Sequence, residues 1–127
     1  MPLVRIDLVR GKPAAFRKSL GEIVLKALTD TINVPSADKF QIITEHAAEE
    51  LNVTDSYLGN DYTQDIVLIQ ITISGGRTVE MKKALFRQIA DDLHAQLKIR
   101  REDVVINLVE VVKENWSFGG GIAQYAV

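Results

Sequence analysis

The sequence contains no cysteine, which excludes a disulfide framework, a thiolate nucleophile and a cysteine-based metal site. It also lacks a basic stretch interleaved with aromatic residues, and its formal net charge of −2 argues against nucleic acid as a partner. No apolar run is long enough to span a bilayer, and no basic segment followed by an apolar stretch opens the chain. We therefore expect a cytoplasmic protein with neither a nucleic-acid nor a membrane partner.

The chain repeats its own pattern at an offset of 65 positions. Gly11 falls on Gly76 and Lys12 falls on Arg77 without a gap. The core-type positions that coincide are Leu3 with Leu68, Ile6 with Ile71, Phe16 with Met81, Leu20 with Leu85, Val24 with Ile89, Leu28 with Leu93 and Val34 with Ile99. This favours a duplication within a single domain of 127 residues, with repeats at about 2–45 and 66–112 and a C-terminal segment at 113–127.

Each half predicts a strand, a helix and a second strand. In the first half, residues 3–9 predict a strand, Pro13 suits the first turn of a helix that ends at 33–36, and residues 40–44 predict the second strand. In the second half the strands are expected at 66–73 and 103–112, with Thr78 as the cap of the helix between them. Residues 46–62 between the halves predict an irregular loop with at most one short strand.

These elements predict an α/β two-layer sandwich of the α+β type. The two helices should cover one face of a four-stranded mixed sheet, and each strand–helix–strand unit should be parallel and right-handed. Apolar residues fill both alternating positions at 66–69 and 104–106, a pattern typical of strands that are buried on both faces.

Pro2 directly follows the initiator methionine and directly precedes the first strand. If Met1 is removed, Pro2 carries a free secondary amine, which no internal proline can supply. Terminal amines titrate near neutral pH, and burial or a neighbouring cation favours the neutral form that a general base requires. While Met1 is attached, however, the Pro2 nitrogen is an amide, and many prolines at this position have no catalytic role.

Arg77 and Asp38 are further candidates, each with an ordinary alternative. Arg77 lies at the start of a helix, where an arginine and free amides together suit a carboxylate, but a solvated surface arginine is equally expected. Asp38 follows a proline and a serine, as turn-forming aspartates often do, and Asp103 stands at the repeat-related position. His46 and His94 have no metal-binding spacing, so we expect no metal site.

Four segments together resemble the tautomerase superfamily, and within it the malonate semialdehyde decarboxylase branch. They are MPL at residues 1–3, VPSADKFQI at 34–42, GRT at 76–78 and WSFGGGIAQ at 116–124. The resemblance covers essentially the whole chain. It implies a homotrimer with active sites near subunit boundaries, a small carboxylic acid as substrate, and neither a metal nor an organic cofactor.

The resemblance also implies roles for individual residues. Pro2 corresponds to the catalytic proline, Asp38 to the carboxylate that assists it, and Arg77 to the arginine that holds the substrate carboxylate. Trp116, Phe118 and Tyr125 correspond to the apolar wall of the substrate-binding site. The decarboxylase branch usually has a second arginine two positions before the first, where this chain has Gly75.

The activity expected first is therefore keto–enol tautomerisation of a small 2-oxo acid, with Pro2 as the base. Two alternatives remain. The chain could decarboxylate a 3-oxo acid or hydrate an unsaturated acid with the help of Asp38, although Gly75 weakens this reading. It could also be a catalytically silent trimeric member, as the retained Met1 and Gly75 would suggest. In each case we expect a homotrimer in which Trp116 or Phe118 contacts a neighbouring chain.

Overall fold

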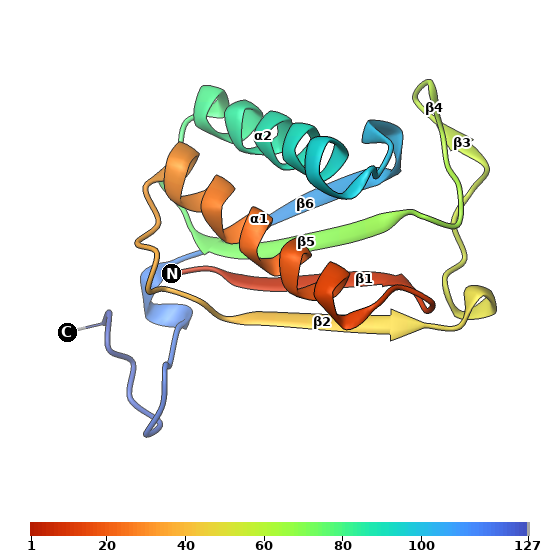
Figure 1. The fold of residues 1–127 in the computed structure, drawn as a ribbon. Helices are drawn as coiled ribbons and strands as arrows, with labels where there is room; N and C mark the ends of the chain where they lie inside the picture. Colours follow the sequence, from red (N-terminus) through yellow and green to blue (C-terminus); the bar gives the residue numbers. More distant parts are fainter. Residues whose placement is uncertain (127) are drawn as a thin grey trace.

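A four-stranded sheet with two helices on one face forms the body of the computed structural model, which describes residues 1–126 (Figure 1). The elements of this body are β1 (Leu3–Val9), α1 (Ala14–Ile32), β2 (Gln41–His46), β5 (Val67–Ser74), α2 (Val79–Leu97) and β6 (Val104–Val111). Their order confirms the predicted α/β sandwich.

The sheet is mixed, with strand order β2-β1-β5-β6. The two strands of each half are parallel, because a helix connects them, and the halves meet through the antiparallel pair β1 and β5. As a result, the starts of β1 and β2 lie at the same end of the sheet as the ends of β5 and β6, so the N-terminus lies near the turn that follows β5.

The core lies between the sheet and the helices. Alternate residues of the two central strands point into it, so that Val4 pairs with Ile71 and Ile6 pairs with Ile69, all almost fully buried. The helices contribute apolar stripes at helical spacing, and their buried members are Leu20, Ile23, Val24, Ala27, Leu28 and Ile32 from α1 and Leu85, Ile89 and Leu93 from α2.

The similarity between the two halves extends to the backbone of the turns. Gly11 and Gly76 both have positive φ, +130° and +113°, where residues with a side chain are rare. Asn33 and Lys98, also 65 positions apart, both end their helices in the left-handed conformation with φ of 62° and 61°. The two halves therefore share the geometry of their turns as well as their apolar pattern.

Local details differ from the sequence-based expectations in two places. Pro13 is the residue before α1 rather than part of its first turn, whereas Thr78 caps α2 as predicted by accepting the backbone N–H of Met81 at 3.2 Å. The connection between the halves contains a 3₁₀ turn, Ala48–Glu50, and a hairpin of two short strands, β3 (Ser56–Tyr57) and β4 (Asn60–Asp61). We had expected one short strand there at most.

The face of the sheet opposite the helices is open in a single chain. Leu68 and Val105, adjacent on this face, are only half-buried, so burial of both faces is not achieved within one chain. Two further 3₁₀ turns, Arg101–Asp103 and Lys113–Asn115, flank β6. Among residues 1–126 there is no helix with the length and apolar character needed to cross a membrane.

Candidate active site

The N-terminus lies at the end of the sheet where β5 and β6 finish (Figure 1). The backbone N–H of Val4 donates to the carbonyl of Phe40 at 2.9 Å, which fastens the start of β1 to the segment that carries Asp38. Pro2 itself is buried. The antiparallel pairing of β1 with β5 brings the turn that carries Arg77 to the same end. Topology therefore brings together the three residues that the sequence singled out.

The terminal amine is electrostatically perturbed. In this structure it belongs to Met1, and burial lowers its pKa from the ordinary value of 8.0. The positive charge of Arg77 lowers the pKa further, while the negative charge of Asp38 opposes this in part. Both side chains thus lie close enough to act on the amine. Removal of Met1 would transfer the free amine to Pro2, one residue further into the fold.

Ser74, at the end of β5, joins two of the candidate residues. Its backbone carbonyl accepts a hydrogen bond from a guanidinium nitrogen of Arg77 at 2.8 Å, and its hydroxyl accepts the indole N–H of Trp116 at 3.0 Å. Ser74 is almost fully buried. Ser74 is not among the residues that the sequence pattern singles out. The available signal was a departure from the repeat, since Ser74 replaces the apolar Val9 at the equivalent position.

Phe118 is the centre of an aromatic cluster. Trp116 stacks on it with ring centroids 5.1 Å apart, and Tyr125 meets it edge-on at 5.3 Å. Phe40 is the fourth member, 5.9 Å from Phe118, and was considered only as part of a strand in the sequence analysis. Gln124 closes the loop between these aromatic residues, because its side chain accepts the Phe118 N–H and donates to the carbonyl of Gly119.

Asp38 is held through its backbone rather than its side chain. Its N–H donates to the carbonyl of Pro35 at 2.9 Å in the turn before β2. Within residues 1–126 the half-buried carboxylate makes no hydrogen bond or ion pair with another residue. It is therefore available to a ligand or to water, unlike a carboxylate that serves only to build a turn.

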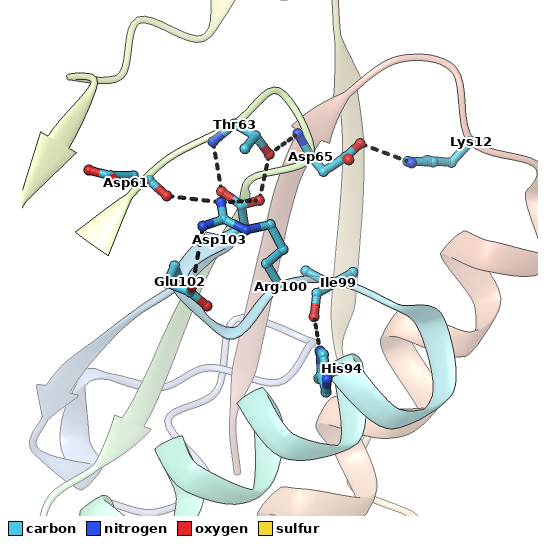
Figure 2. Close-up of polar contacts among 9 residues, drawn as sticks. All are labelled: Lys12, Asp61, Thr63, Asp65, His94, Ile99, Arg100, Glu102 and Asp103. Carbon is cyan, nitrogen blue, oxygen red and sulfur yellow. Dashed lines mark hydrogen bonds and ion pairs between the residues drawn. The ribbon is translucent and has the colours of Figure 1, made fainter. Parts of the chain in front are cut away.

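The repeat-related end of the sheet shows the contrast (Figure 2). There Asp103 is fully buried and accepts hydrogen bonds from the backbone and hydroxyl of Thr63 at 2.8 and 2.5 Å, with Arg100 at 3.5 Å. Lys12, the counterpart of Arg77, pairs with Asp65 at 3.0 Å. The polar groups at this end are thus occupied with one another, which identifies Asp103 as the structural member of the aspartate pair.

Glu110 lies against Gly75, the position at which the decarboxylase branch usually has its second arginine. A Cβ atom placed on Gly75 would lie 3.0 Å from a carboxylate oxygen of Glu110, closer than most Cβ contacts. Glu110 in turn forms an ion pair with Lys82. The chain therefore presents one arginine, not two, beside the terminal amine.

Neither histidine lies in a metal-binding group. His46 pairs with Asp7 at 2.6 Å on the open face of the sheet, and His94 contacts the carbonyl of Ile99 at 3.1 Å. Among the residues that the structure describes, no three His, Cys, Asp or Glu side chains are grouped in a way that could hold a metal ion. The ionisable groups that the structure places together at the end of the sheet where β5 and β6 finish are the terminal amine, Asp38 and Arg77.

Comparison with known proteins assigns the family. Two models described as "Tautomerase enzyme" match residues 38–119 and residues 2–60. The chain is 38% identical to "Probable tautomerase YusQ" of Bacillus subtilis (strain 168) over 124 residues, covering 98% of both chains. The chain belongs to the tautomerase family. A second Bacillus subtilis relative of this family, "Probable tautomerase YrdN", is 32% identical, with 98% of this chain and 96% of the relative covered.

Solved structures agree with this assignment. A malonate semialdehyde decarboxylase superposes with a TM-score of 0.90 at 30% identity, covering 97% of this chain and 95% of that one. The FG41 malonate semialdehyde decarboxylase, inhibited by 3-bromopropiolate, gives 0.89 at 34% identity, with coverage of 97% and 93%. A symmetric trimer of a fused 4-OT gives 0.79 at 25% identity, with 98% of each chain covered. The resemblance to the tautomerase superfamily, with the decarboxylases among its structural neighbours, is confirmed.

Proposed function

We propose that this protein is a cofactor-independent tautomerase that interconverts the enol and keto forms of a small 2-oxo acid, with Pro2 as the base. The observation that carries the proposal is the terminal amine of lowered pKa beside Arg77 and Asp38. A lowered pKa favours the neutral form of the amine, and the neutral form can accept a proton and return it.

In this mechanism Met1 is first removed, so that Pro2 carries the free amine. The neutral amine takes the hydroxyl proton of the enol as its C=O bond forms, and the resulting ammonium delivers a proton to the neighbouring carbon. The net reaction moves one proton from oxygen to carbon and leaves the amine unchanged. Because no electrons are transferred, the reaction needs no redox cofactor.

Arg77 would hold the carboxylate of the substrate. One of its guanidinium nitrogens donates to Ser74, and this bond orients the group while other N–H donors stay available for a two-point contact. The aromatic cluster of Trp116, Phe118, Tyr125 and Phe40 would cover the apolar part of the substrate and exclude water.

The test uses protein from which Met1 has been removed, with ketonisation of phenylenolpyruvate as the assay. Pro2→Ala retains a terminal amine but loses the secondary amine, so we expect a clear loss of kcat/KM. Pro13→Ala, an exposed proline before α1, is the matched control and should keep the parental rate. Equal rates for Pro2→Ala and the parent would overturn the role of Pro2.

Decarboxylation or hydration is the second candidate, and the free carboxylate of Asp38 favours it. A carboxylate without a protein partner next to the amine could activate water or assist loss of carbon dioxide, and the structural similarity to malonate semialdehyde decarboxylase supports this. Measuring carbon dioxide release from malonate semialdehyde, with Asp38→Asn as the control, separates the two activities. No release above background would leave tautomerisation as the remaining activity.

A catalytically silent member of the family is the third candidate. Its motive is Gly75, which stands where the decarboxylase branch usually has its second arginine. A protein that retained Met1 would also be silent, because its Pro2 nitrogen would be an amide. Intact-mass spectrometry of protein made in its native host tests this point, because a mass that lacks Met1 means that Pro2 carries a free amine.

We further propose that the protein assembles as a homotrimer with its active sites near subunit boundaries. Apolar side chains remain exposed around the aromatic cluster, among them Ile122 at 61% and Phe40 at 44%. A neighbouring chain would cover them. The symmetric trimer of the fused 4-OT relative supports the same arrangement.

A further inference from the structure

The turn that presents Arg77 is built from glycine. Gly75 and Gly76 follow Ser74 directly, and Gly76 has a φ of +113°. Glycine leaves the backbone more freedom than any other residue, so this turn loses more conformational entropy when it is fixed. If Arg77 is to present its guanidinium in one position, neighbouring elements have to hold the turn.

An ion pair between two elements lies beside this turn. Glu110 lies near the end of β6 and pairs with Lys82 in the first turns of α2. The carboxylate lies against Gly75, with an oxygen 3.0 Å from the place a Cβ would occupy. On the backbone side, the N–H of Gly75 donates to the carbonyl of Val111 at 3.2 Å. The glycine turn is thus enclosed between β6 and the start of α2.

The same pair recurs at the repeat-related turn. Sixty-five positions earlier, Glu45 pairs with Arg17 at 3.1 Å, and its other carboxylate oxygen accepts the N–H of Gly11 at 3.4 Å. Arg17 also donates to the carbonyl of Lys12 at 2.7 Å. In both halves a carboxylate from the second strand and a cation from the helix bracket the glycine turn.

We propose that Glu110 and Lys82 are positioning residues for Arg77, holding the Gly75–Gly76 turn so that the guanidinium meets the substrate carboxylate. This inference rests on the proposed function. The positioning role and a simple charge effect predict opposite changes in substrate binding when Glu110 is replaced. If the negative charge of Glu110 merely repelled the substrate carboxylate, its removal would improve binding. If the pair positions Arg77, its removal weakens binding.

The experiment compares Glu110→Gln with Glu45→Gln, its repeat-related counterpart at the opposite end. We expect Glu110→Gln to raise KM for phenylenolpyruvate about fivefold while kcat stays within about twofold, since the loss falls on carboxylate binding. Glu45→Gln should leave KM unchanged, although the two variants lower the melting temperature by similar amounts. The charge-swapped double variant Lys82→Glu with Glu110→Lys should restore most of the binding.

Amide hydrogen exchange of residues 74–78 gives a readout that needs no substrate. We expect faster exchange there in Glu110→Gln and no change there in Glu45→Gln. An inactive parent enzyme would overturn the proposed function, while the exchange comparison would still test the positioning role. A lower or unchanged KM in Glu110→Gln, an equal rise in both variants, or unchanged exchange at 74–78 would overturn the positioning role.

Discussion

The repeat-related aspartates Asp38 and Asp103 lie at opposite ends of the sheet and have different surroundings. The carboxylate of Asp103 is fully buried and has three donors, two on Thr63 and one on Arg100, whereas the carboxylate of Asp38 has no partner within residues 1–126. The difference comes from the segments around them. Thr63 and Arg100 surround Asp103, while the terminal amine and Arg77 lie near Asp38.

Substitution of the two aspartates should therefore separate stability from activity. Asp103→Ala leaves the Thr63 donors without their acceptor and should cost about 3 kcal/mol of unfolding free energy, because hydrogen bonds to charged groups are strong. Asp38→Ala should change stability by less than about 0.5 kcal/mol but reduce activity. Urea denaturation followed by circular dichroism, beside the enzyme assay, measures both. A stability loss of the same size in Asp38→Ala would contradict a free carboxylate.

The amine predicts the pH dependence of the enzyme. The pKa of the Met1 amine is lowered from the ordinary value of 8.0, and Pro2, which carries the amine once Met1 is removed, is the more buried of the two residues. We expect kcat/KM of Met1-free protein to rise with pH as the amine loses its proton and then to level off. Burial is the main cause of the lowered pKa of the Met1 amine, and the positive charge of Arg77 is the second. Replacing Arg77 should therefore reverse part of the lowering.

Two substitutions should move the midpoint of this rise in opposite directions. Arg77→Met removes a positive charge that lowers the amine pKa, so the midpoint should move up. Asp38→Asn removes a negative charge that raises it, so the midpoint should move down. Lys12→Met, at the repeat-related position and paired with Asp65, is the control and should leave it in place. Shifts in the same direction for both site variants would contradict this assignment.

Ser74 should act through Trp116 as well as through Arg77. Ser74→Ala removes the acceptor of the indole N–H, at a cost of about 1 kcal/mol. Since Trp116 is the single tryptophan, its fluorescence reports the change directly, and we expect a red shift together with a higher KM. Thr72→Ala, two residues earlier on the same face of β5, should show neither effect. An unchanged spectrum in Ser74→Ala would show that this hydrogen bond does not hold the indole.

At the level of elements, the periodic spacing of apolar residues predicted the helices and the main strands. The helices and main strands lie within a residue or two of their expected bounds, because buried positions such as Leu20 and Leu85 recur with regular spacing. The hairpin at β3 and β4 was missed in part, because its strands are two residues long and lie at the surface. Such a hairpin has no apolar alternation from which it could be predicted.

The candidate site depends on the fold in a similar way. Pro2, Asp38 and Arg77 were proposed from position and resemblance, and the antiparallel pairing of the halves explains why the structure places them at one end of the sheet. Ser74 and Phe40 were not found, since a serine and a phenylalanine at strand ends carry no local signal. Their contribution depends on a segment about 40 or more positions away that folds back over them.

At the level of the whole molecule, the sheet has an exposed face that a single chain does not cover. Apolar side chains on this face, such as Leu68, Val105 and Val109, remain partly exposed. The polar side chains among them are largely paired, because Asp7 bonds His46 and Gln70 bonds Asn107 at 3.1 Å. Paired polar groups can be buried at little cost, so this face is suited to an interface.

We therefore expect the protein to be a homotrimer in solution, with Trp116 or Phe118 within contact distance of a neighbouring chain. Closed cyclic association would bury the open face of each sheet and the apolar side chains around Phe118 together. Light scattering should give about three times the 14.1 kDa mass of one chain at micromolar concentration. A stable monomer under these conditions would refute the assembly and, with it, an active site shared between subunits.

A pair of charge substitutions tests which face forms the interface. Val105→Lys places an unpaired charge on the open face, next to Leu68 of the neighbouring strand, and should dissociate the trimer, because burying that charge without a partner is costly. Ala95→Lys adds the same charge on the exposed side of α2 and should leave the mass unchanged. If Val105→Lys remained trimeric, the open face would be solvated in the assembly. If both variants dissociated, the added net charge would explain the loss of the trimer, and the open face would not be identified as the interface. The interface is assigned to the open face only if Val105→Lys dissociates and Ala95→Lys does not.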